Sequence, residues 1–454
     1  MGWAWSGLRA GRVIAALTNC RTRTSRTSRT VRDLLPLAKH KCRTAWTKAA
    51  DADVTSWFTD GVQDVVKLPQ RHTGAGELFQ LLRDGRPRTR ADLAAATGQA
   101  RSTIAARVDM LMAAGLISPA GEATSTGGRP PTTFAFCPSA KVVLAVELGA
   151  THARAAITDL GSTVLAETES PLAIAEGPQV VLDWVVTAAR TLLAEHGRDL
   201  GDLAGVGVGL PGPVEHSTGR PINPPIMPAW DDVDVPGILA AQLHAPVLVD
   251  NDVNLMALGE HRTAWPDVDD LLFVKVATGI GSGVICDGDL RRGAQGTAGD
   301  IGHIAVPGAE GVPCRCGNVG CLEAVASGHA VAAALTRQGL TAATGADVVA
   351  LVRSGDLAAS RAVRQAGREI GAVLAACVSL LNPSMIVIGG ILAEAGEHLI
   401  AGIREVVYSR TLPLATQHLR IVTSQARSQV GILGASAMAV DHVLSPEAVD
   451  ALIA

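Results

Sequence analysis

The chain has 454 residues, 48% of them hydrophobic and 18% charged, so it is long enough for two or three domains and a sizeable core. Its net charge of −4 is unevenly distributed, because residues 1–140 hold 20 Lys and Arg against 10 Asp and Glu. A basic front on an acidic body favours a nucleic-acid-binding part followed by a part with another role. The apolar runs are too short to span a bilayer, and Arg9 and Arg12 interrupt the apolar core that a signal peptide needs; we expect a cytoplasmic protein that does not contact membranes.

Residues 1–70 carry a basic low-complexity tract, RTRTSRTSRT at positions 21–30, without periodic apolar residues. Such a composition does not bury enough apolar surface to fold. Residues 1–70 could be an arm that binds DNA phosphates, or they could be a disordered extension without a role. The composition favours the disordered extension.

Residues 71–137 have the signals of a helix-turn-helix. Thr89 and Asp92 have the spacing of a capping box, with Asp in place of the usual Glu or Gln. The helix that this box opens, over 91–97, ends before a glycine, and a further helix over 101–114 has apolar residues at helical spacing. Two helices joined by a short glycine turn are typical of a helix-turn-helix. In this motif the second helix enters the major groove of DNA by its N-terminal end. The predicted DNA contacts of this end are Arg101, Ser102, Thr103 and Arg107.

A wing follows these helices. Leu116 and Ile117 begin a strand, residues 127–131 read GGRPP as a tip, and residues 133–136 form the returning strand. Arg129 at the tip is placed to reach a phosphate or the minor groove. The alternative is a helical interaction module without a DNA role, but the basic balance and the wing favour DNA.

From residue 138 to 454 the sequence alternates between strands and helices, which predicts an α/β body. Helices are expected over 180–193 and over much of 324–380. The expected strands are 142–148, 153–158, 163–167, 206–210, 246–249, 271–276 and 386–388.

Asn251 and Asp252 follow directly after an apolar strand, where open α/β sheets place ligand-binding groups. Asp252 could accept a proton from a hydroxyl that attacks a phosphate, or the pair could cap the next helix; the two roles are compatible. Two glycine-rich stretches, 278–283 and 389–390, also follow strands. Backbone N–H groups approach phosphates in such loops, although the same sequences are also typical of tight hairpins.

The most informative stretch runs from His303 to Glu323. It places His303, Cys314, Cys316 and Cys321 on a glycine-rich loop, and three thiols with one imidazole can form a tetrahedral zinc site. The alternative is that the cysteines are buried thiols that behave as small hydrophobes. Their clustering favours zinc, whereas the five other cysteines are scattered, which indicates reduced thiols.

If one ring nitrogen of His303 binds zinc, the other can donate a hydrogen bond to a ligand hydroxyl. Asp300 and Glu323 bracket this histidine in the sequence, and carboxylates accept hydrogen bonds from sugar hydroxyls. The alternative for either acid is an ordinary surface carboxylate. Their position against the metal ligands favours a role in binding.

Taken together, these residues resemble the ROK family, which joins repressors, open reading frames and kinases. The resemblance covers about residues 71–440 and is most specific from His303 to Glu323. It implies an N-terminal winged helix-turn-helix and an actin-like, ribonuclease-H-type α/β body with a small lobe (about 141–251 plus a C-terminal helix) and a large lobe (about 252–430). It also implies structural Zn²⁺ on the four ligands above and a sugar in the cleft. The residues implied to contact the sugar are Asn251, Asp252, Asp300, His303 and Glu323.

The chain departs from the family's kinases at several positions of the site. Those kinases begin the first strand with an Asp-x-Gly-x-Thr-Lys-like phosphate turn, whereas this chain has Glu147 and His152 at the two ends of that stretch, and histidine lacks the permanent charge of lysine. Asp300 stands where the kinases have Glu, and Ile226 stands where many have Asn. Because phosphoryl transfer depends on positioning and charge, these losses favour sugar binding without catalysis.

We therefore expect a sugar-responsive transcriptional repressor of carbohydrate-metabolism genes, with a small sugar or sugar phosphate as effector. It would bind a palindromic operator as a homodimer or a dimer of dimers. The alternative is an ATP-dependent sugar kinase with Asp252 as general base and Mg-ATP as donor, and a zinc-stabilised scaffold with neither activity is a third interpretation. The residues expected to bind phosphate in the kinase alternative are Gly149, Thr151, Thr278, Gly279, Gly281, Gly283, Gly389 and Gly390.

Overall fold

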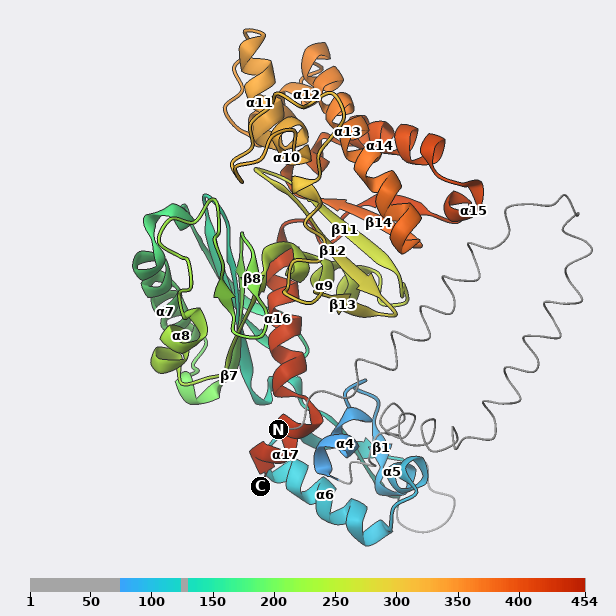
Figure 1. Cartoon of the computed structure of the whole chain (residues 1–454). Coiled ribbons are helices and arrows are strands. Elements are labelled where there is room, and N and C mark those ends of the chain that lie inside the picture. Colours follow the sequence, from blue (N-terminus) through green and yellow to red (C-terminus); the bar gives the residue numbers. More distant parts are fainter. Residues whose placement is uncertain (1–73, 124–129, 454) are drawn as a thin grey trace, which may run out of the picture. The chain divides into compact units, whose positions relative to one another are not determined.

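The computed structural model describes residues 74–123 and 130–453, and Figure 1 labels their helices and strands. The extension expected over residues 1–70 and the wing-tip residue Arg129 lie outside the described residues. No helix among those described is long and apolar enough to cross a membrane.

Three short helices and a small antiparallel sheet form the predicted winged helix-turn-helix. Its elements are α4 (Ala75–Gln80), β1 (Arg88–Thr89), α5 (Arg90–Thr97), α6 (Arg101–Ala113), β2 (Ile117–Glu122) and β3 (Thr132–Phe136). The predicted capping box is confirmed, because the Thr89 hydroxyl accepts from the Asp92 N–H and the Asp92 carboxylate accepts from the Thr89 N–H. Gly98 ends α5 in the left-handed conformation, with φ of 69°. The apolar face of α6 packs against the core of the winged helix, where Ile104 and Leu111 are fully buried.

Two five-stranded sheets form the body of the chain (Figure 1). Their strands are β4 (Val142–Leu148), β5 (Ala153–Asp159), β6 (Val164–Ser170), β7 (Leu203–Leu210), β10 (Val247–Asn251), β11 (Leu271–Val276), β12 (Ile280–Cys286), β13 (Asp289–Arg291), β14 (Met385–Gly389) and β15 (Arg420–Thr423). The first sheet has the order β10-β7-β4-β5-β6. Strands β10, β7 and β4 pair in parallel, whereas β5 pairs antiparallel with β4 and β6 pairs antiparallel with β5. The second sheet, β13-β12-β11-β14-β15, repeats this pattern strand for strand. This repeated strand order agrees with the expected ribonuclease-H-type body.

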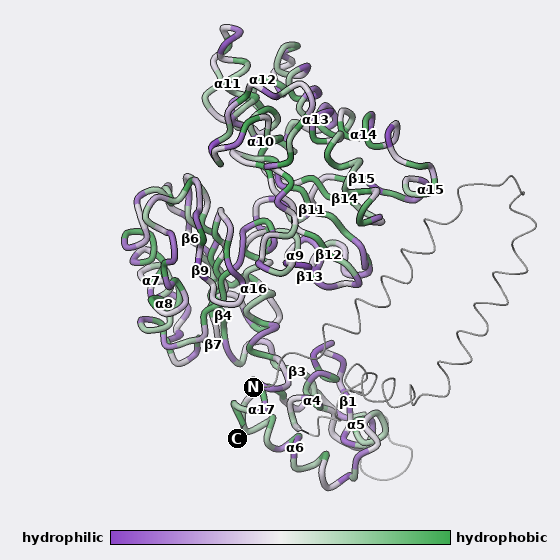
Figure 2. Tube along the Cα trace, in the orientation of Figure 1, coloured by the Kyte–Doolittle hydropathy of each residue, from purple (hydrophilic) through white to green (hydrophobic). Residues whose placement is uncertain are grey.

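Two helices lie between the sheets, and other helices complete the two cores. Helix α16 (Val430–Val443) packs on β4 and β7 of the first sheet, and α9 (Asp252–Ala264) packs on β11 and β12 of the second. The remaining helices of the body are α7 (Pro178–Glu195), α8 (Val235–Leu243), α10 (Leu322–Ala326), α11 (Gly328–Arg337), α12 (Gly345–Arg353), α13 (Leu357–Leu381), α14 (Glu397–Arg410), α15 (Pro413–Thr416) and α17 (Pro446–Ile453). Helices α7 and α8 join the core of the first sheet, and α10 to α14 join that of the second. Figure 2 shows the hydrophobic stretches of the strands on which these cores are built.

Helices α9 and α16 approach each other backbone to backbone, because glycines stand at their contact. A side chain at Gly434 would overlap the carbonyl oxygen of Leu255, and one at Gly259 would overlap the carbonyl oxygen of Val430. Only glycine allows this approach. The two helices therefore form one rigid layer between the sheets.

The chain end connects this layer to the winged helix. The Gly76 N–H donates to Asp450 Oδ1 at 2.7 Å, and Gln80 Nε2 donates to the Leu444 carbonyl at 2.8 Å. Apolar side chains of the winged helix, the first sheet and α16–α17 also share one core. Its members include Phe79, Leu82, Leu93, Val143, Leu160, Val440, Leu444 and Val449.

The glycine-rich turn expected over 278–283 is shorter in the structure. Strands β11 and β12 form an antiparallel hairpin in which Val276 pairs with Ile280, so the turn spans only residues 277–279. Gly281 and Gly283 lie within β12, and a side chain at Gly283 would overlap Ala257 of α9. The second half of the glycine pattern therefore reflects the close packing of α9 on the sheet.

We expect Gly434→Ala to lower the free energy of unfolding by about 3 kcal/mol or more, because the added methyl group meets backbone atoms that have no room to move. Urea unfolding followed by circular dichroism measures the change. Gly311→Ala is the matched control, since no atom lies within 4 Å of the added carbon there, and it should alter stability by less than about 0.5 kcal/mol. Equal stability of the two variants would contradict the proposed rigid layer.

Candidate functional site

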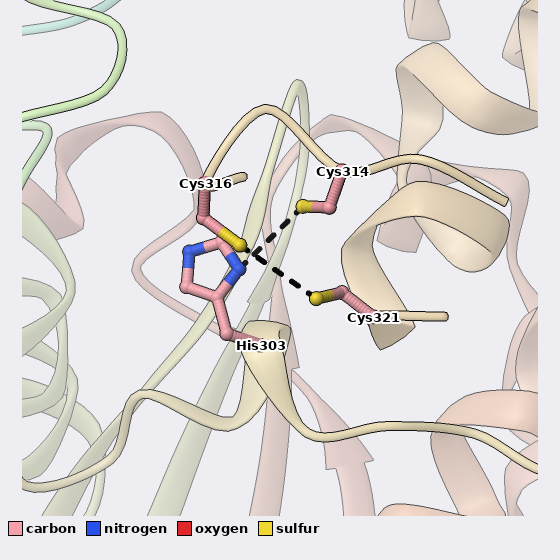
Figure 3. Close-up of side chains that lie close together, drawn as sticks. All are labelled: His303, Cys314, Cys316 and Cys321. Atoms are coloured by element: carbon pink, nitrogen blue, oxygen red, sulfur yellow. Dashed lines mark hydrogen bonds between the residues drawn. The ribbon is translucent and has the colours of Figure 1, made fainter. Parts of the chain in front are cut away.

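The predicted metal ligands converge in the structure (Figure 3). His303 Nδ1 lies 3.7 Å from Cys314 Sγ, Cys316 Sγ lies 3.7 Å from Cys321 Sγ, and the four ligand atoms all lie within 4.8 Å of one another. Metal–sulfur bonds of about 2.3 Å in a tetrahedron separate the ligand atoms by roughly 3.7 Å. The donor set and its spacing therefore fit a tetrahedral divalent metal.

Short backbone pairings build this cluster. His303 ends a single 3-10 turn, and Cys321 directly precedes α10. Between them, Ala305 pairs with Cys321 and the Cys314 N–H donates to the Asn318 carbonyl at 2.8 Å. Gly317 has φ of 92°, a conformation that favours glycine. These contacts fix the backbone around His303, Cys314 and Cys321.

The thiols differ in their electrostatic environment. Burial and hydrogen bonds to the neighbouring thiols raise the pKa of Cys321 to about 12, and burial raises the pKa of Cys314. The backbone N–H of Asn318 lowers the pKa of Cys316. Since metals bind thiolates, binding must displace protons from Cys314 and Cys321, and affinity should increase with pH.

Asp252, the first residue of α9, meets a buried lysine that the sequence analysis did not single out. Lys275 Nζ donates to Asp252 Oδ2 at 2.5 Å, and the two side chains are 22% and 7% exposed. Burial alone would lower the pKa of the ammonium, but the carboxylates of Asp252, Glu147 and Glu323 outweigh it and raise that pKa. Lys275 is therefore a permanent positive charge among these acids.

Residues 147–152, which correspond to the phosphate turn of the family's kinases, carry an acid and a neutral imidazole. Glu147 near the end of β4 lies against Gly431, where any side chain would overlap its carboxylate. Burial raises the pKa of Glu147, although Lys275 and Arg154 oppose the shift. Burial and Lys275 lower the pKa of His152. Neither group offers a phosphate the positive charge of a lysine.

The loop of His303 and helix α10 meet at the beginning of β12. Glu323 Oε2 accepts the Ile280 N–H at 3.1 Å, and a side chain at Gly302 would overlap the Ile280 carbonyl. Asp300 Oδ1 lies 4.0 Å from His303 Nε2, the nitrogen that faces away from the thiols. The structure thus brings Glu323 to the beginning of β12 and Asp300 to His303.

Asn251 serves as the N-cap of α9. Its Oδ1 accepts the Val253 N–H at 2.9 Å, and its Nδ2 donates to the Gly212 carbonyl at 2.8 Å. The capping role considered in the sequence analysis is confirmed. One amide hydrogen of Asn251 is left over for a ligand.

A second ionic cluster beside Asn251 escaped the sequence analysis. The Asp250 side chain is 1% exposed; its Oδ2 accepts Arg292 Nε at 2.6 Å and its Oδ1 accepts Asn254 Nδ2 at 2.9 Å. His216 Nδ1 lies 3.7 Å from Asp250 Oδ2, and burial together with Arg292 lowers the pKa of this histidine. The run Asp250-Asn251-Asp252 after an apolar strand was the available signal, but it did not identify Arg292 as a partner.

The predicted phosphate-binding glycines have packing roles. Gly149 lies against the ring of His152, and a side chain at Gly389 would overlap the ring of Phe273. Gly390 has φ of 82°. Gly279 lies against the Glu323 carboxylate, whereas Thr151 and Thr278 are exposed.

The predicted DNA-contacting residues lie on the N-terminal half of α6. Arg101 and Ser102 are exposed in its first turn, and Thr103 is half-buried. Arg107 is also half-buried, and its Nη1 donates to Gln99 Oε1. Arg107 is therefore held by the helix-turn-helix itself, whereas Arg101 and Ser102 present their side chains to solvent.

Arg90 was missed by the sequence analysis. Its guanidinium lies 4.7 Å from the centre of the Phe134 ring, and its Nη2 lies 2.7 Å from Asp109 Oδ1. It thereby links the beginning of α5 to α6 and to β3. A hollow opens beside it, lined by Thr89, Arg90, Ala91, Arg101, Pro131 and Thr132.

The ROK family profile matches residues 143–442, and a winged helix-turn-helix DNA-binding profile matches residues 78–118. The chain belongs to the ROK family. It is 27% identical over 359 residues to the xylose repressor of Caldicellulosiruptor bescii, and the match covers 76% of this chain and 90% of that protein. It is 30% identical over 305 residues to the glucokinase of Halalkalibacterium halodurans, covering 64% of this chain and 92% of that protein.

Among solved structures, the chain resembles a ROK family transcriptional regulator described as a homologue of the E. coli MLC protein. The two are 26% identical with a TM-score of 0.72, and the match covers 84% of this chain and 98% of the other. The regulator match covers 84% of this chain, whereas the glucokinase match covers 64%, and a winged helix-turn-helix profile matches the chain before the ROK body. The ROK repressor branch, expected from the sequence, is therefore supported.

We expect Lys275→Met to lower the free energy of unfolding by about 3 kcal/mol, because it leaves Asp252 without its cation. This is the lower end for a broken buried ion pair, since 22% of the lysine side chain reaches solvent. Thermal unfolding measures the loss. Lys141→Met is the control, because Lys141 donates to the Gly201 carbonyl on an exposed surface and its loss should change stability by less than about 0.5 kcal/mol. Similar stability of the two variants would argue against a buried charge centre.

Proposed function

We propose that this chain is a sugar-responsive DNA-binding repressor of carbohydrate-metabolism genes. One observation carries the proposal: a winged helix-turn-helix shares a hydrophobic core with a ROK body that has Glu147 and His152 at the stretch where the family's kinases bind phosphate. The repressor named above supports it, since the name of that protein describes a xylose repressor.

The effector is proposed to bind beside the start of α9 and the metal loop. Asn251, Asp252, Asp300, His303 and Glu323 are the proposed contacts. Oxygen atoms predominate in this set, and sugar hydroxyls donate to such atoms. The metal cluster supports the arrangement, because it orients the His303 ring so that Nε2 faces Asp300.

The operator is proposed to meet α6 and the wing. Arg101, Ser102, Thr103 and Arg107 are the proposed contacts of the helix, and Arg129 is that of the wing. A homodimer would present two such units to two half-sites. Helices α13 and α14 run side by side, and the exposed leucines near their C-terminal ends are proposed as dimer contacts. These are Leu380, Leu412 and Leu414, which are 77% to 84% exposed.

The cluster of His303, Cys314, Cys316 and Cys321 is proposed to hold structural Zn²⁺. Three thiolates and an imidazole are ligands that zinc prefers, and a site closed by four protein ligands is typical of a structural role. When bound, the metal would fix the loop and the tautomer of His303.

A sugar kinase is the second candidate, and the similarity to a glucokinase favours it. Asp252 would be the general base, with Mg-ATP as phosphoryl donor. Three observations oppose it: Lys275 occupies Asp252 Oδ2, and Glu147 and His152 stand at the phosphate turn. ATP consumption with hexoses and N-acetylhexosamines discriminates the two, since a pure regulator consumes none.

The function is tested by titrating the metal-containing protein onto a fluorescent DNA fragment from upstream of its own gene, with and without D-glucose, D-xylose and N-acetyl-D-glucosamine, each also as a phosphate ester. We expect competitor-resistant binding that one of these compounds changes. Arg101→Ala should weaken DNA binding roughly tenfold or more, whereas Arg361→Ala, on the exposed surface of α13, should leave it unchanged. Weak binding that fades with salt and responds to no sugar would refute the repressor.

Metal analysis tests the zinc proposal. We expect about one zinc ion per chain and loss of most of it in Cys314→Ser. Cys137→Ser is the control, since Cys137 lies outside the cluster. Zinc retained by Cys314→Ser, or an unchanged sugar response in zinc-free protein, would overturn the proposal.

A further inference from the structure

One carboxylate links three segments that lie far apart in the sequence. Asp441, near the end of α16, accepts Arg83 Nη2 on Oδ1 at 2.8 Å and Arg262 Nη2 on Oδ2 at 2.7 Å. Arg83 belongs to the turn that follows α4 of the winged helix, and Arg262 belongs to the last turn of α9. Each oxygen of Asp441 therefore holds a different part of the molecule.

The effector side of this linkage is a single helix. Helix α9 begins with Asp252, and Arg262 follows ten residues later, about 15 Å along the axis. Its middle is locked against α16 at Gly259 and Gly434. A displacement at Asp252 therefore reaches Arg262 as a movement of the whole helix rather than as a local change.

The DNA side of the linkage is also ordered. Arg83 Nη1 donates to Gln80 Oε1 at 3.4 Å, and Gln80 Nε2 donates to the Leu444 carbonyl at 2.8 Å. Helix α4 is additionally held by Gly76 and Asp450. These other contacts tie the winged helix to α16 and α17, but Arg262 is the residue through which the polar network reaches α9.

We propose that Asp441 is a positioning residue that couples the effector site to the winged helix through Arg262 and Arg83. Effector binding moves α9 together with α16, Arg262 keeps the Asp441 carboxylate in place on the moving pair, and the hold of Asp441 on Arg83 changes as a result. The ion pairs suit this role because 28% to 50% of their side chains is exposed, so they exchange partners with little loss of free energy. The inference rests on the proposed function for its biological purpose, but the coupling itself is a property of the fold.

Hydrogen exchange measured on the full chain tests the coupling without any effector. Four proteins are compared: the unmodified chain, Asp252→Asn, Asp441→Asn and the double variant. Asp252→Asn weakens the bond to Lys275 and perturbs the start of α9. We expect it to change the exchange of amides in residues 75–84 by at least about threefold, and we expect this increment to vanish in the chain that also carries Asp441→Asn.

Glu405→Gln is the matched control for Asp441→Asn. Glu405 also holds two arginines, Arg364 at 3.0 Å and Arg368 at 3.8 Å, but all three lie on α13 and α14. The Asp252→Asn increment should persist in this background. Asn251→Ala, which removes the N-cap of α9, replaces Asp252→Asn if that variant does not fold. An increment that is absent, or that is equal with and without the Asp441→Asn substitution, overturns the proposal.

A second measurement separates this proposal from the proposed function. The ratio of DNA dissociation constants with and without the responsive sugar should fall at least about threefold in Asp441→Asn, while sugar affinity without DNA changes less than about twofold. A merely structural residue would lower stability without changing that ratio. If no sugar affects DNA binding by the unmodified chain, the proposed function fails, and the exchange experiment still decides whether Asp441 couples α9 to α4.

Discussion

The close approach of α9 and α16 is the constraint on which the rest of the structure depends. Each helix covers one sheet, and glycines at 259 and 434 let their backbones meet. Because backbone atoms do not rearrange as side chains do, the pair has no soft element along its contact. The ends of α9 then acquire fixed surroundings: Asp252 meets Lys275 at one end, and Arg262 meets Asp441 at the other.

The charges at the Asp252 end of α9 favour sugar binding over phosphoryl transfer. A lysine placed among Glu147, Asp252 and Glu323 keeps its charge, and it holds an oxygen that a kinase would need as a base. The same acids remain suited to sugar hydroxyls through their other oxygen atoms. A site built on a kinase fold can therefore lose phosphoryl transfer and still recognise a sugar. A sugar sensor requires only that recognition.

The parts predicted correctly from sequence are those built from neighbours in the chain. The capping box of Thr89 and Asp92 spans four residues, and the cysteines span eight, so spacing alone indicates their geometry. Lys275 was missed although it is the one charge in the strand LLFVKV: a buried charge demands a partner, but the sequence does not say which. The arginine partners of Asp250 and Asp441 come from 42 to 358 residues away, and only the fold reveals them.

The winged helix is not a self-contained domain in this fold. Helix α4 has six residues, too few to be stable alone, and its Phe79 shares a core with Val440, Leu444 and Val449 from the chain end. The polypeptide thus returns from the second sheet, passes between both sheets as α16 and completes the core of the DNA-binding unit. Any change in how α9 and α16 lie against the sheets therefore changes the support of the recognition helix, and the ion pairs of Asp441 with Arg262 and Arg83 link that change to α4.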